Sequence, residues 1–341
     1  MYRPFMSVTA RSTPNIAFIK YWGNRSDELR LPMAPSLSMT LDRPTVEITV
    51  ENADAFSVRS FLADGSEKTL KEKDTERFRK VIALMQRYLE SLKLKSVPLE
   101  QLAITVRSHI PPAIGLASSA AVFSCLAKAV AGLVQDQSKL SDREVSILAR
   151  LGSGSAARSI FGGFSTLEEG SGMEPGSSWS EQIADEKHWT LYDIVTIPAM
   201  EEKKVGSTEG HALASTSPFY ADRVQAIRSS RQQECIDAIQ KKDFEALQRV
   251  TEEDCLDMHH VMETSVPPLH YLNAETHRIV NAIKELRSKE HIPVLFTMDA
   301  GPTVHLVCPE EGRAAILSFA HAQKGCTIFE TKVGPGASLI G

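Results

Sequence analysis

Polar and hydrophobic residues alternate along several short stretches of this chain, which has 341 residues. In residues 44–61, β-branched side chains such as Val46 and Ile48 alternate with polar ones, which predicts strand. Asp64-Gly65 then predicts a hairpin turn. Further strands are predicted over residues 102–109, 191–198 and 326–333, and on both sides of the Asp299-Ala300-Gly301-Pro302 turn.

A spacing of three to four residues between apolar positions predicts helices elsewhere. Residues 74–93 place their apolar side chains on one helical face. Ser141 and Asp142 predict the start of a helix that ends near Leu151. The other predicted helices cover residues 119–134, 219–240, 243–263, 273–289 and 309–322. Strands and helices are mixed without a regular βαβ alternation, so we predict an α+β fold rather than a doubly wound sheet.

Length and composition limit the domain number and the partners. A chain of this length predicts two domains, and we place them at residues 1–185 and 186–341, with the Gly/Ser-rich stretch 170–180 near the junction. Hydrophobic residues make up 42% and charged residues 24%, as in soluble globular proteins. The net charge of −5 gives no electrostatic case for nucleic acid or an anionic membrane, so an anionic substrate needs a local basic pocket.

The cysteines and the N-terminus indicate a cellular compartment. The five cysteines are scattered and show no CxxC or Cys/His ligand spacing, which favours free thiols in a reducing cytosol over a zinc site. The N-terminus lacks a signal-peptide pattern. The longest apolar stretch, residues 120–134, is interrupted by Lys128 and is too short to span a bilayer. We therefore expect a soluble, cytoplasmic protein.

A loop of small residues, 112–120, joins a predicted strand to a predicted helix. Gly115 lets the backbone approach a ligand closely, and the helix start offers unpaired N–H groups and a positive dipole end for phosphate. Ser118 and Ser119 add hydroxyls that reach phosphate oxygens or magnesium. A serine-capped helix after a tight turn explains the loop alone about as well. No GxxxxGK[ST] motif occurs, so a P-loop NTPase is not supported.

A second run of small residues, Gly152 to Ala157, precedes Arg158. Two glycines and two serines ahead of an arginine are suited to an anion pocket, because the planar guanidinium matches a carboxylate or phosphate. Taken alone, this run is explained more simply as a helix N-terminus with a surface arginine. In a similar way, His259 and His260 lie in a predicted helix without a partner triad, which favours packing over metal binding.

Together, the two runs resemble the phosphate loop and second motif of the GHMP kinase superfamily. Other segments narrow the resemblance: PNIAFIKYWG at 14–23, LP with SLSMT at 31–40, GSGSAARSIFGG at 152–163 and FTMDAGP at 296–302. These four motifs, in this order, are similar to those of the mevalonate diphosphate decarboxylase family. The resemblance extends from about residue 8 to 336.

The resemblance implies two α+β lobes with the active site in the cleft between them. It also implies an ATP- and magnesium-dependent decarboxylation of a 5-phosphorylated mevalonate in isoprenoid biosynthesis, and a homodimer. Asp299 matches the carboxylate that orients the tertiary 3-hydroxyl and accepts its proton. Arg158 matches the arginine that holds the substrate carboxylate, and Lys20 matches the active-site lysine, which would help Asp299 stay ionised.

The same resemblance assigns the remaining site residues. Those expected at ATP are Ser108, Gly115, Leu116, Ala117, Ser118 and Ser119, with Ser119 also near the metal. Those expected at the substrate are Tyr21, Asn24, Ser153, Gly154, Ser155, Ser207 and, from a looser local match, Arg77.

Departures from the family pattern concern the phosphate end of the substrate. Asn24 replaces a lysine, Gly206 a serine and His211 a methionine. Losing a cation and donors suits a smaller anion, which favours mevalonate 5-phosphate as substrate and isopentenyl phosphate as product. Compensation by neighbouring residues would instead leave mevalonate 5-diphosphate as the substrate. A GHMP kinase that does not decarboxylate and a non-catalytic binding protein are further alternatives, and the intact catalytic motifs disfavour both.

Overall fold

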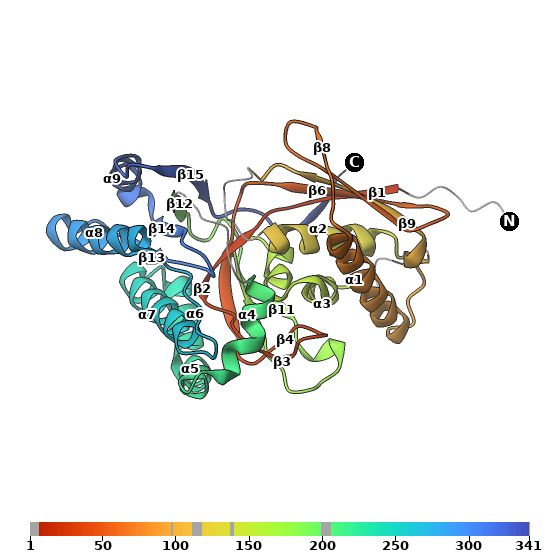
Figure 1. Cartoon of the computed structure of the whole chain (residues 1–341), viewed down its shortest axis with the longest axis horizontal. Helices are drawn as coiled ribbons and strands as arrows, with labels where there is room; N and C mark the ends of the chain where they lie inside the picture. Colours follow the sequence, from red (N-terminus) through yellow and green to blue (C-terminus); the bar gives the residue numbers. More distant parts are fainter. Residues whose placement is uncertain (1–6, 97, 111–117, 137–139, 199–205, 341) are drawn as a thin grey trace.

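The computed structural model describes residues 7–96, 98–110, 118–136, 140–198 and 206–340, with the side chains of residues 118, 207 and 208 left out. Within these residues the chain forms three main sheets, of six, four and four strands, and a two-stranded hairpin. Figure 1 shows α1–α3 on the side of the first sheet and α5–α9 at the opposite end of the molecule. The predicted α+β fold is confirmed.

The first sheet has the strand order β16-β1-β6-β9-β7-β8, and only the β7–β9 pair is parallel. Its strands are Ser7–Ser12 (β1), Val46–Asn52 (β6), Ser57–Phe61 (β7), Glu67–Lys68 (β8), Leu102–Ser108 (β9) and Ser338–Ile340 (β16). Helices Glu72–Ser91 (α1), Ser118–Gly132 (α2) and Asp142–Gly152 (α3) share one hydrophobic core with it. α2 packs directly on β1 and β6. It also packs against the short helix Gly154–Ile160, which belongs to the second run of small residues.

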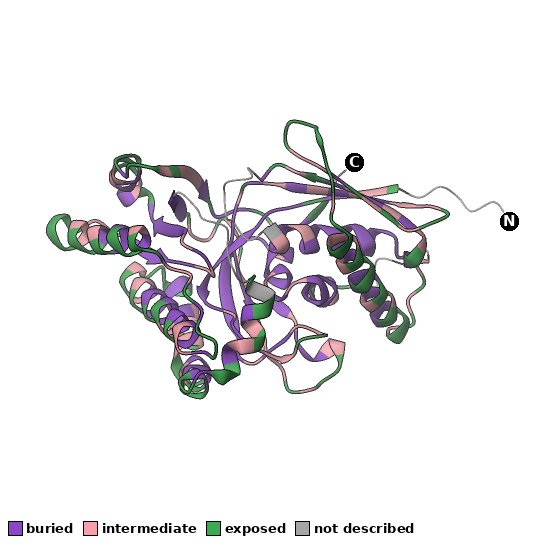
Figure 2. Ribbon diagram, in the orientation of Figure 1, coloured by how far each residue is buried: buried purple, intermediate pink, exposed green. Residues whose placement is uncertain are grey.

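The second sheet forms the middle of the molecule. It consists of Asn15–Ile19 (β2), Ser36–Thr40 (β5), Phe164–Leu167 (β10) and Ser180–Ala184 (β11), in the order β11-β10-β5-β2. Every residue of β2, β5 and β10 is buried, and these strands lie at the centre of the view in Figure 2. The hairpin of Asn24–Ser26 (β3) and Leu31–Pro32 (β4) follows β2. Because both faces of the sheet are covered, polar side chains placed here are held in a protein interior.

The third sheet has the order β13-β14-β12-β15. Its strands are Tyr192–Pro198 (β12), Leu295–Thr297 (β13), Val304–Cys308 (β14) and Cys326–Lys332 (β15). The helices of this half are Ser207–Leu213 (α4), Tyr220–Ala226 (α5), Gln232–Lys241 (α6), Phe244–Glu263 (α7), Ala274–Glu290 (α8) and Glu310–His321 (α9). α7 packs against both β2 and β13, and so joins the second sheet to the third.

Most predicted elements are present, and two of them differ from the prediction. Residues 44–61 form two strands, β6 and β7, rather than one. The predicted helix 219–240 is α5 and α6 with a π-helical turn, Ile227–Arg231, between them. The predicted start at Ser141 is confirmed, since its hydroxyl accepts the Glu144 N–H in a capping box. The strands that were not predicted are β1–β5, β8, β10, β11 and β16.

The end of the chain returns to its beginning. β16 pairs with β1 in antiparallel register, with Thr9 opposite Ile340. The division into residues 1–185 and 186–341 stays a prediction. All five cysteines are free thiols, as expected. Among the described residues, no helix combines the length and apolar character that crossing a membrane requires.

Candidate active site

Lys20 and Asp299 meet where the second and third sheets adjoin. Lys20 directly follows β2, and Asp299 lies in the turn between β13 and β14. The Lys20 Nζ and Asp299 Oδ1 atoms are 2.7 Å apart. The Lys20 side chain is only 2% exposed, whereas that of Asp299 is 43% exposed. A buried cation therefore holds a carboxylate whose outer side is open to a ligand.

The surroundings of Asp299 keep it ionised. Burial alone would raise the pKa of its carboxyl, but the positive charges of Lys20 and Arg158 and the hydrogen bond from Lys20 lower that pKa to about 2. His305 is itself buried and its Nδ1 lies 2.7 Å from Asp193 Oδ2. The carboxylate is thus available at neutral pH to accept a hydrogen bond, while its low basicity makes it a weak proton acceptor.

Arg158 is a buried cation bonded to neutral groups. It lies in the short helix Gly154–Ile160 and is 2% exposed. Its Nε donates to Ser38 Oγ at 2.8 Å, its Nη1 to Ser36 Oγ at 2.6 Å and its Nη2 to Asn15 Oδ1 at 3.2 Å. Burial lowers its pKa to about 10, so it stays charged at neutral pH. No carboxylate in the described part of the chain forms an ion pair with it, which leaves its charge available to an anionic ligand.

The two small-residue runs come together at the start of α2. The Ser119 and Ser153 hydroxyl oxygens are 3.2 Å apart, and those of Ser153 and Ser155 are 3.3 Å apart. The start of α2 presents backbone N–H groups and the positive end of its dipole beside these hydroxyls, an arrangement that binds phosphate. Gly115, Leu116 and Ala117 lie outside the described residues, as does the side chain of Ser118.

Tyr21 and Gly154 connect this cluster to the β3–β4 hairpin. A Cβ atom on Gly154 would lie 2.4 Å from the Tyr21 ring, so only glycine allows this contact. The Tyr21 hydroxyl donates to Asn24 Oδ1. Asn24 Nδ2 in turn donates to Asp27 Oδ1 at 2.7 Å. Burial raises the pKa of Tyr21, so its hydroxyl stays a neutral donor. Asn24 is therefore engaged by its neighbours and adds no positive charge here.

A hollow of about 620 Å³ lies between the β3–β4 hairpin and α1. Its charged lining consists of Arg30, Lys73, Arg77, Lys80 and Arg87 together with Asp27, Glu28 and Glu76. Arg77 Nη2 donates to the Gly152 carbonyl at 3.1 Å, which places the hollow next to Ser153. The excess of cations supplies the local basic pocket that an anionic substrate needs in a chain of net negative charge.

His211 lies against the same hairpin. Its ring stacks between Tyr21 and Trp22, with ring centroids 4.4 and 4.5 Å away. Its Nδ1 accepts the Gly23 N–H at 2.9 Å. Burial, together with the charge of Arg30, lowers the pKa of His211 to about 3, so the ring is neutral at physiological pH. The histidine at this position thus packs and orients the segment that follows Lys20.

Ser108 and Ser207 are two further site residues expected from the sequence, and His259 is the histidine expected to pack in a helix. Ser108 ends β9, and its Oγ accepts the Ile110 N–H at 3.3 Å. Ser207 begins α4, and its side chain lies outside the described residues. His259 is buried among the core residues of α7. Within the described part of the chain, no group of three His, Cys, Asp or Glu side chains is placed to hold a metal.

Several residues that build the site were not predicted. Asn15, Ser36 and Ser38 hold Arg158, and the motifs that contain them were recognised without a role for these side chains. His305 and Asp193 form a buried pair in the third sheet, and His305 acts electrostatically on Asp299. β12 and β14 are buried at every residue, and two ionisable residues on such apolar strands are the only signal the sequence offers for this pair.

Both halves of the chain match domains of diphosphomevalonate decarboxylases. Residues 12–179 match the diphosphomevalonate decarboxylase-like N-terminal domain. Residues 194–333 match the mevalonate 5-diphosphate decarboxylase C-terminal domain. The diphosphomevalonate decarboxylase of Candida albicans is 30% identical over an alignment of 356 positions, which covers 97% of this chain and 97% of that protein.

Solved structures show the same relationship over the whole chain. The mevalonate diphosphate decarboxylase of Staphylococcus aureus has a TM-score of 0.86 and 32% identity, covering 99% of this chain and 98% of that one. The complex of MDDEF with MVAPP, AMPPCP and magnesium has a TM-score of 0.85 and 31% identity, covering 98% and 99%. Together with the paired Lys20 and Asp299 and the buried Arg158, these matches show that the chain belongs to the mevalonate diphosphate decarboxylase family of the GHMP kinase superfamily.

Proposed function

We propose that this chain catalyses the ATP-dependent decarboxylation of mevalonate 5-diphosphate to isopentenyl diphosphate, ADP, phosphate and CO2. The observation that carries the proposal is the ionised, partly exposed Asp299 held by buried Lys20. It lies near Arg158, a cation without a carboxylate partner among the described residues. One site thus offers an acceptor for a hydroxyl and a cation for a carboxylate, which are the two groups that the reaction changes.

Asp299 orients the 3-hydroxyl for attack on the γ-phosphorus of ATP. The hydroxyl oxygen forms a bond to phosphorus as the bond to the ADP oxygen breaks. Such phosphoryl transfer depends on positioning and charge more than on early proton removal, which suits a carboxylate with a pKa of about 2. Lys20 fixes the carboxylate in place, and Asp299 takes the hydroxyl proton as the new bond forms.

Arg158 holds the substrate carboxylate during the second step. The electrons of the bond between the carboxylate and its neighbouring carbon form the new C=C bond, CO2 leaves, and phosphate departs from C3. The three neutral oxygens that bond the guanidinium hold it rigid, so it needs no rearrangement to bind the carboxylate. Because no covalent intermediate with the protein is required, orientation by Arg158 is the main contribution of the chain to this step.

The start of α2 is the proposed nucleotide-phosphate site. Ser119 presents its hydroxyl there, next to the Ser153 and Ser155 hydroxyls that stay predicted substrate contacts, and Ser119 would hold magnesium through its hydroxyl oxygen, the hard donor type that this ion prefers. Bound magnesium supplies charge neutralisation between the phosphate groups of ATP. The relative in complex with MVAPP, AMPPCP and magnesium supports ATP and magnesium as ligands of this chain. Gly115, Leu116, Ala117, Ser118 and Ser108 stay predicted nucleotide contacts.

The comparisons support the diphosphate better than the monophosphate that the sequence departures favour. The curated relatives are diphosphomevalonate decarboxylases. Arg30 and Arg77 line the basic hollow beside Tyr21, and they supply cations in place of the lysine that Asn24 replaces. Mevalonate 5-phosphate stays a second candidate because Asn24 is neutral and bonded to the acidic Asp27.

A side-by-side assay tests the proposal. The protein is given ATP and magnesium with mevalonate 5-diphosphate or mevalonate 5-phosphate, and ADP and CO2 are both followed. Equal ADP and CO2 release, faster with the diphosphate, is the expected result. Preference for the monophosphate would establish the second candidate. ADP release without CO2 would make the protein a small-molecule kinase and overturn the proposal.

Two further expectations concern the whole protein. A homodimer follows only from the family resemblance, and light scattering coupled to gel filtration tests it: a mass near twice 37.5 kDa is expected, and a mass near 37.5 kDa would contradict it. A cytoplasmic location likewise stays a proposal, and the free cysteines support it.

A further inference from the structure

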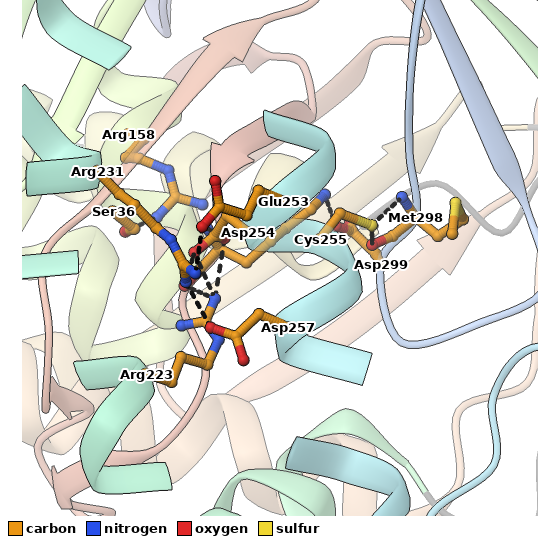
Figure 3. Close-up of polar contacts among 11 residues, drawn as sticks. Ser36, Arg158, Arg223, Arg231, Glu253, Asp254, Cys255, Asp257, Met298 and Asp299 are labelled. Carbon is orange, nitrogen blue, oxygen red and sulfur yellow. Dashed lines mark hydrogen bonds and ion pairs between the residues drawn. The ribbon is translucent and has the colours of Figure 1, made fainter. Parts of the chain in front are cut away.

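Two consecutive residues of α7, Asp254 and Cys255, bond the backbone at Lys20 and at Met298, the residue before Asp299. Figure 3 shows Asp254 beside Arg223 and Cys255 beside Met298. Asp254 is completely buried, and its Oδ2 accepts the backbone N–H of Lys20 at 2.7 Å. A buried carboxylate bonded to one particular backbone N–H is costly to desolvate, so it requires further partners.

Arg223 of α5 supplies those partners. Its Nη2 lies 2.9 Å from both oxygens of Asp254 and also donates to the Lys20 carbonyl at 3.3 Å. Arg223 is 2% exposed, so the ion pair is shielded from water. The N–H and the C=O of Lys20 are therefore both held by one buried ion pair. Position 20 is fixed at its main chain as well as by the bond from its Nζ atom.

Cys255 holds the backbone next to Asp299 in a similar way. Its Sγ accepts the Met298 N–H at 3.1 Å and donates to the Met298 carbonyl at 3.6 Å. Met298 immediately precedes Asp299, and both Cys255 and Met298 are buried. The backbone that leads into Asp299 is thus held by the residue next to Asp254.

We infer that Asp254 and Cys255 are positioning residues that set the separation between Lys20 Nζ and Asp299 Oδ1 from a single turn of α7. Lys20 belongs to the second sheet and Asp299 to the third, and α7 packs against both. Neither residue faces the substrate. The inference rests on the proposed function as far as catalysis is concerned, because it assigns them to the same reaction.

A displacement of α7 is therefore expected to change the distance between Lys20 and Asp299. A shift of about 1 Å in a reacting group costs on the order of 100-fold in rate even where binding is preserved. Loosening one of these contacts is therefore expected to lower kcat more than it raises KM for ATP. Loss of general stability would also lower the apparent kcat at unchanged KM, because less of the enzyme is folded, so kcat is expressed per folded enzyme from thermal unfolding of each variant.

Cysteine variants test the inference with a matched control. Cys255→Ala removes both contacts to Met298, whereas Cys235→Ala removes a thiol buried in α6 that makes no hydrogen bond to Lys20, Met298 or Asp299 within the described part of the chain. We expect kcat to fall about 10- to 100-fold in Cys255→Ala with KM for ATP within about twofold, and Cys235→Ala to keep wild-type kcat. Cys255→Ser keeps a donor and acceptor and is expected to restore kcat to within about threefold of wild type. Equal kcat values in the two alanine variants, or no rescue by serine, would overturn the inference.

Aspartate variants test the other half. Asp254→Asn weakens the hold on Lys20, while Asp237→Asn, the same change at a partly exposed site on α6, removes a carboxylate that pairs with Lys241. The expected loss in kcat is confined to Asp254→Asn, and Asp254→Glu, which keeps the charge, is expected to recover part of it. Should Asp254→Asn fail to fold, the cysteine series decides the question.

Crystal structures of Cys255→Ala and Cys235→Ala separate this inference from the proposed function. The Lys20 Nζ to Asp299 Oδ1 distance, 2.7 Å here, is expected to lengthen in Cys255→Ala alone. An unchanged distance would overturn the inference whatever the enzyme does. If the wild-type protein released no CO2 from mevalonate 5-diphosphate, the proposed function would fail while this distance still decided whether α7 sets the pair.

Discussion

Lys20 and Asp299 are 279 residues apart in the chain, and their Nζ and Oδ1 atoms are 2.7 Å apart in the fold. The lysine is buried and the aspartate is open on one side, so the pair is asymmetric. The lysine cannot easily turn to another anion, and Asp299 keeps its second oxygen for a ligand. This asymmetry fits the proposed role of the pair in orienting a reacting hydroxyl.

The first prediction concerns the charge of Asp299. Asp299→Asn keeps the shape of the side chain but removes its negative charge, so we expect kcat to fall by about 10²–10⁴ because the hydroxyl loses its acceptor. ATP affinity, measured by calorimetry, is expected to stay within about twofold, since Asp299 is not at the start of α2. Asp222→Asn, at an exposed site on α5, is the control and should match the wild type. Near-normal turnover of Asp299→Asn would remove this residue from the mechanism.

The second prediction concerns the buried guanidinium. Arg158→Lys keeps a charge but loses the planar fork that bonds Ser36 and Ser38, so we expect kcat/KM for the mevalonate substrate to fall about 10²–10³-fold. KM for ATP should change much less. Thermal unfolding of the same variant measures how much of the loss is structural.

Arg228→Lys gives the matched control for that substitution. Arg228 pairs with Glu169 on the surface and is 43% exposed, so the same chemical change there should leave turnover unaltered. Equal kcat/KM values for the two variants would show that Arg158 has no special part in binding the substrate carboxylate.

The candidate site residues can be predicted from the sequence more completely than the strands that position them. Lys20, Arg158 and Asp299 are found because each stands in a long motif that resembles one family. The strands beneath them are harder to predict. β2, β5 and β10 are buried on both faces, so they lack the alternation that identified residues 44–61.

Contacts between distant side chains are beyond a single sequence. Asp254 has the pattern of an ordinary acidic residue on an amphipathic helix, next to Glu252 and Glu253. Only the packing of α7 against β2 turns it inward to the Lys20 N–H. In the same way, nothing in the sequence indicates that the charge of Arg30 acts on Tyr21. Arg30 lines the basic hollow, and the cations of that hollow bear on whether the loss of a lysine at position 24 matters.

The third prediction concerns the phosphate end of the substrate. Asn24→Lys adds a cation next to Tyr21, and Arg30→Gln removes one from the basic hollow. We expect the ratio of kcat/KM for the diphosphate to that for the monophosphate to rise about tenfold in the first variant and to fall about tenfold in the second, as one charge-assisted hydrogen bond implies. Lys324→Gln, at an exposed site after α9, should leave the ratio unchanged. If neither variant changes the ratio, these positions do not select the substrate.

The fourth prediction is a pH dependence of stability that comes from His211. Its folded pKa is about 3, because burial and Arg30 disfavour the proton, against about 6.5 in the unfolded chain. Its contribution to stability is therefore complete above about pH 6.5 and is lost as the pH falls toward 3, at no more than about 1.4 kcal/mol per pH unit. Protonation would also break the bond from the Gly23 N–H. Urea unfolding at about pH 7.5 and about pH 5 measures this, and His211→Gln should lose less stability between the two than wild type. His321→Gln, at the exposed end of α9, should behave like wild type; an equal loss in His211→Gln and wild type would contradict the assignment.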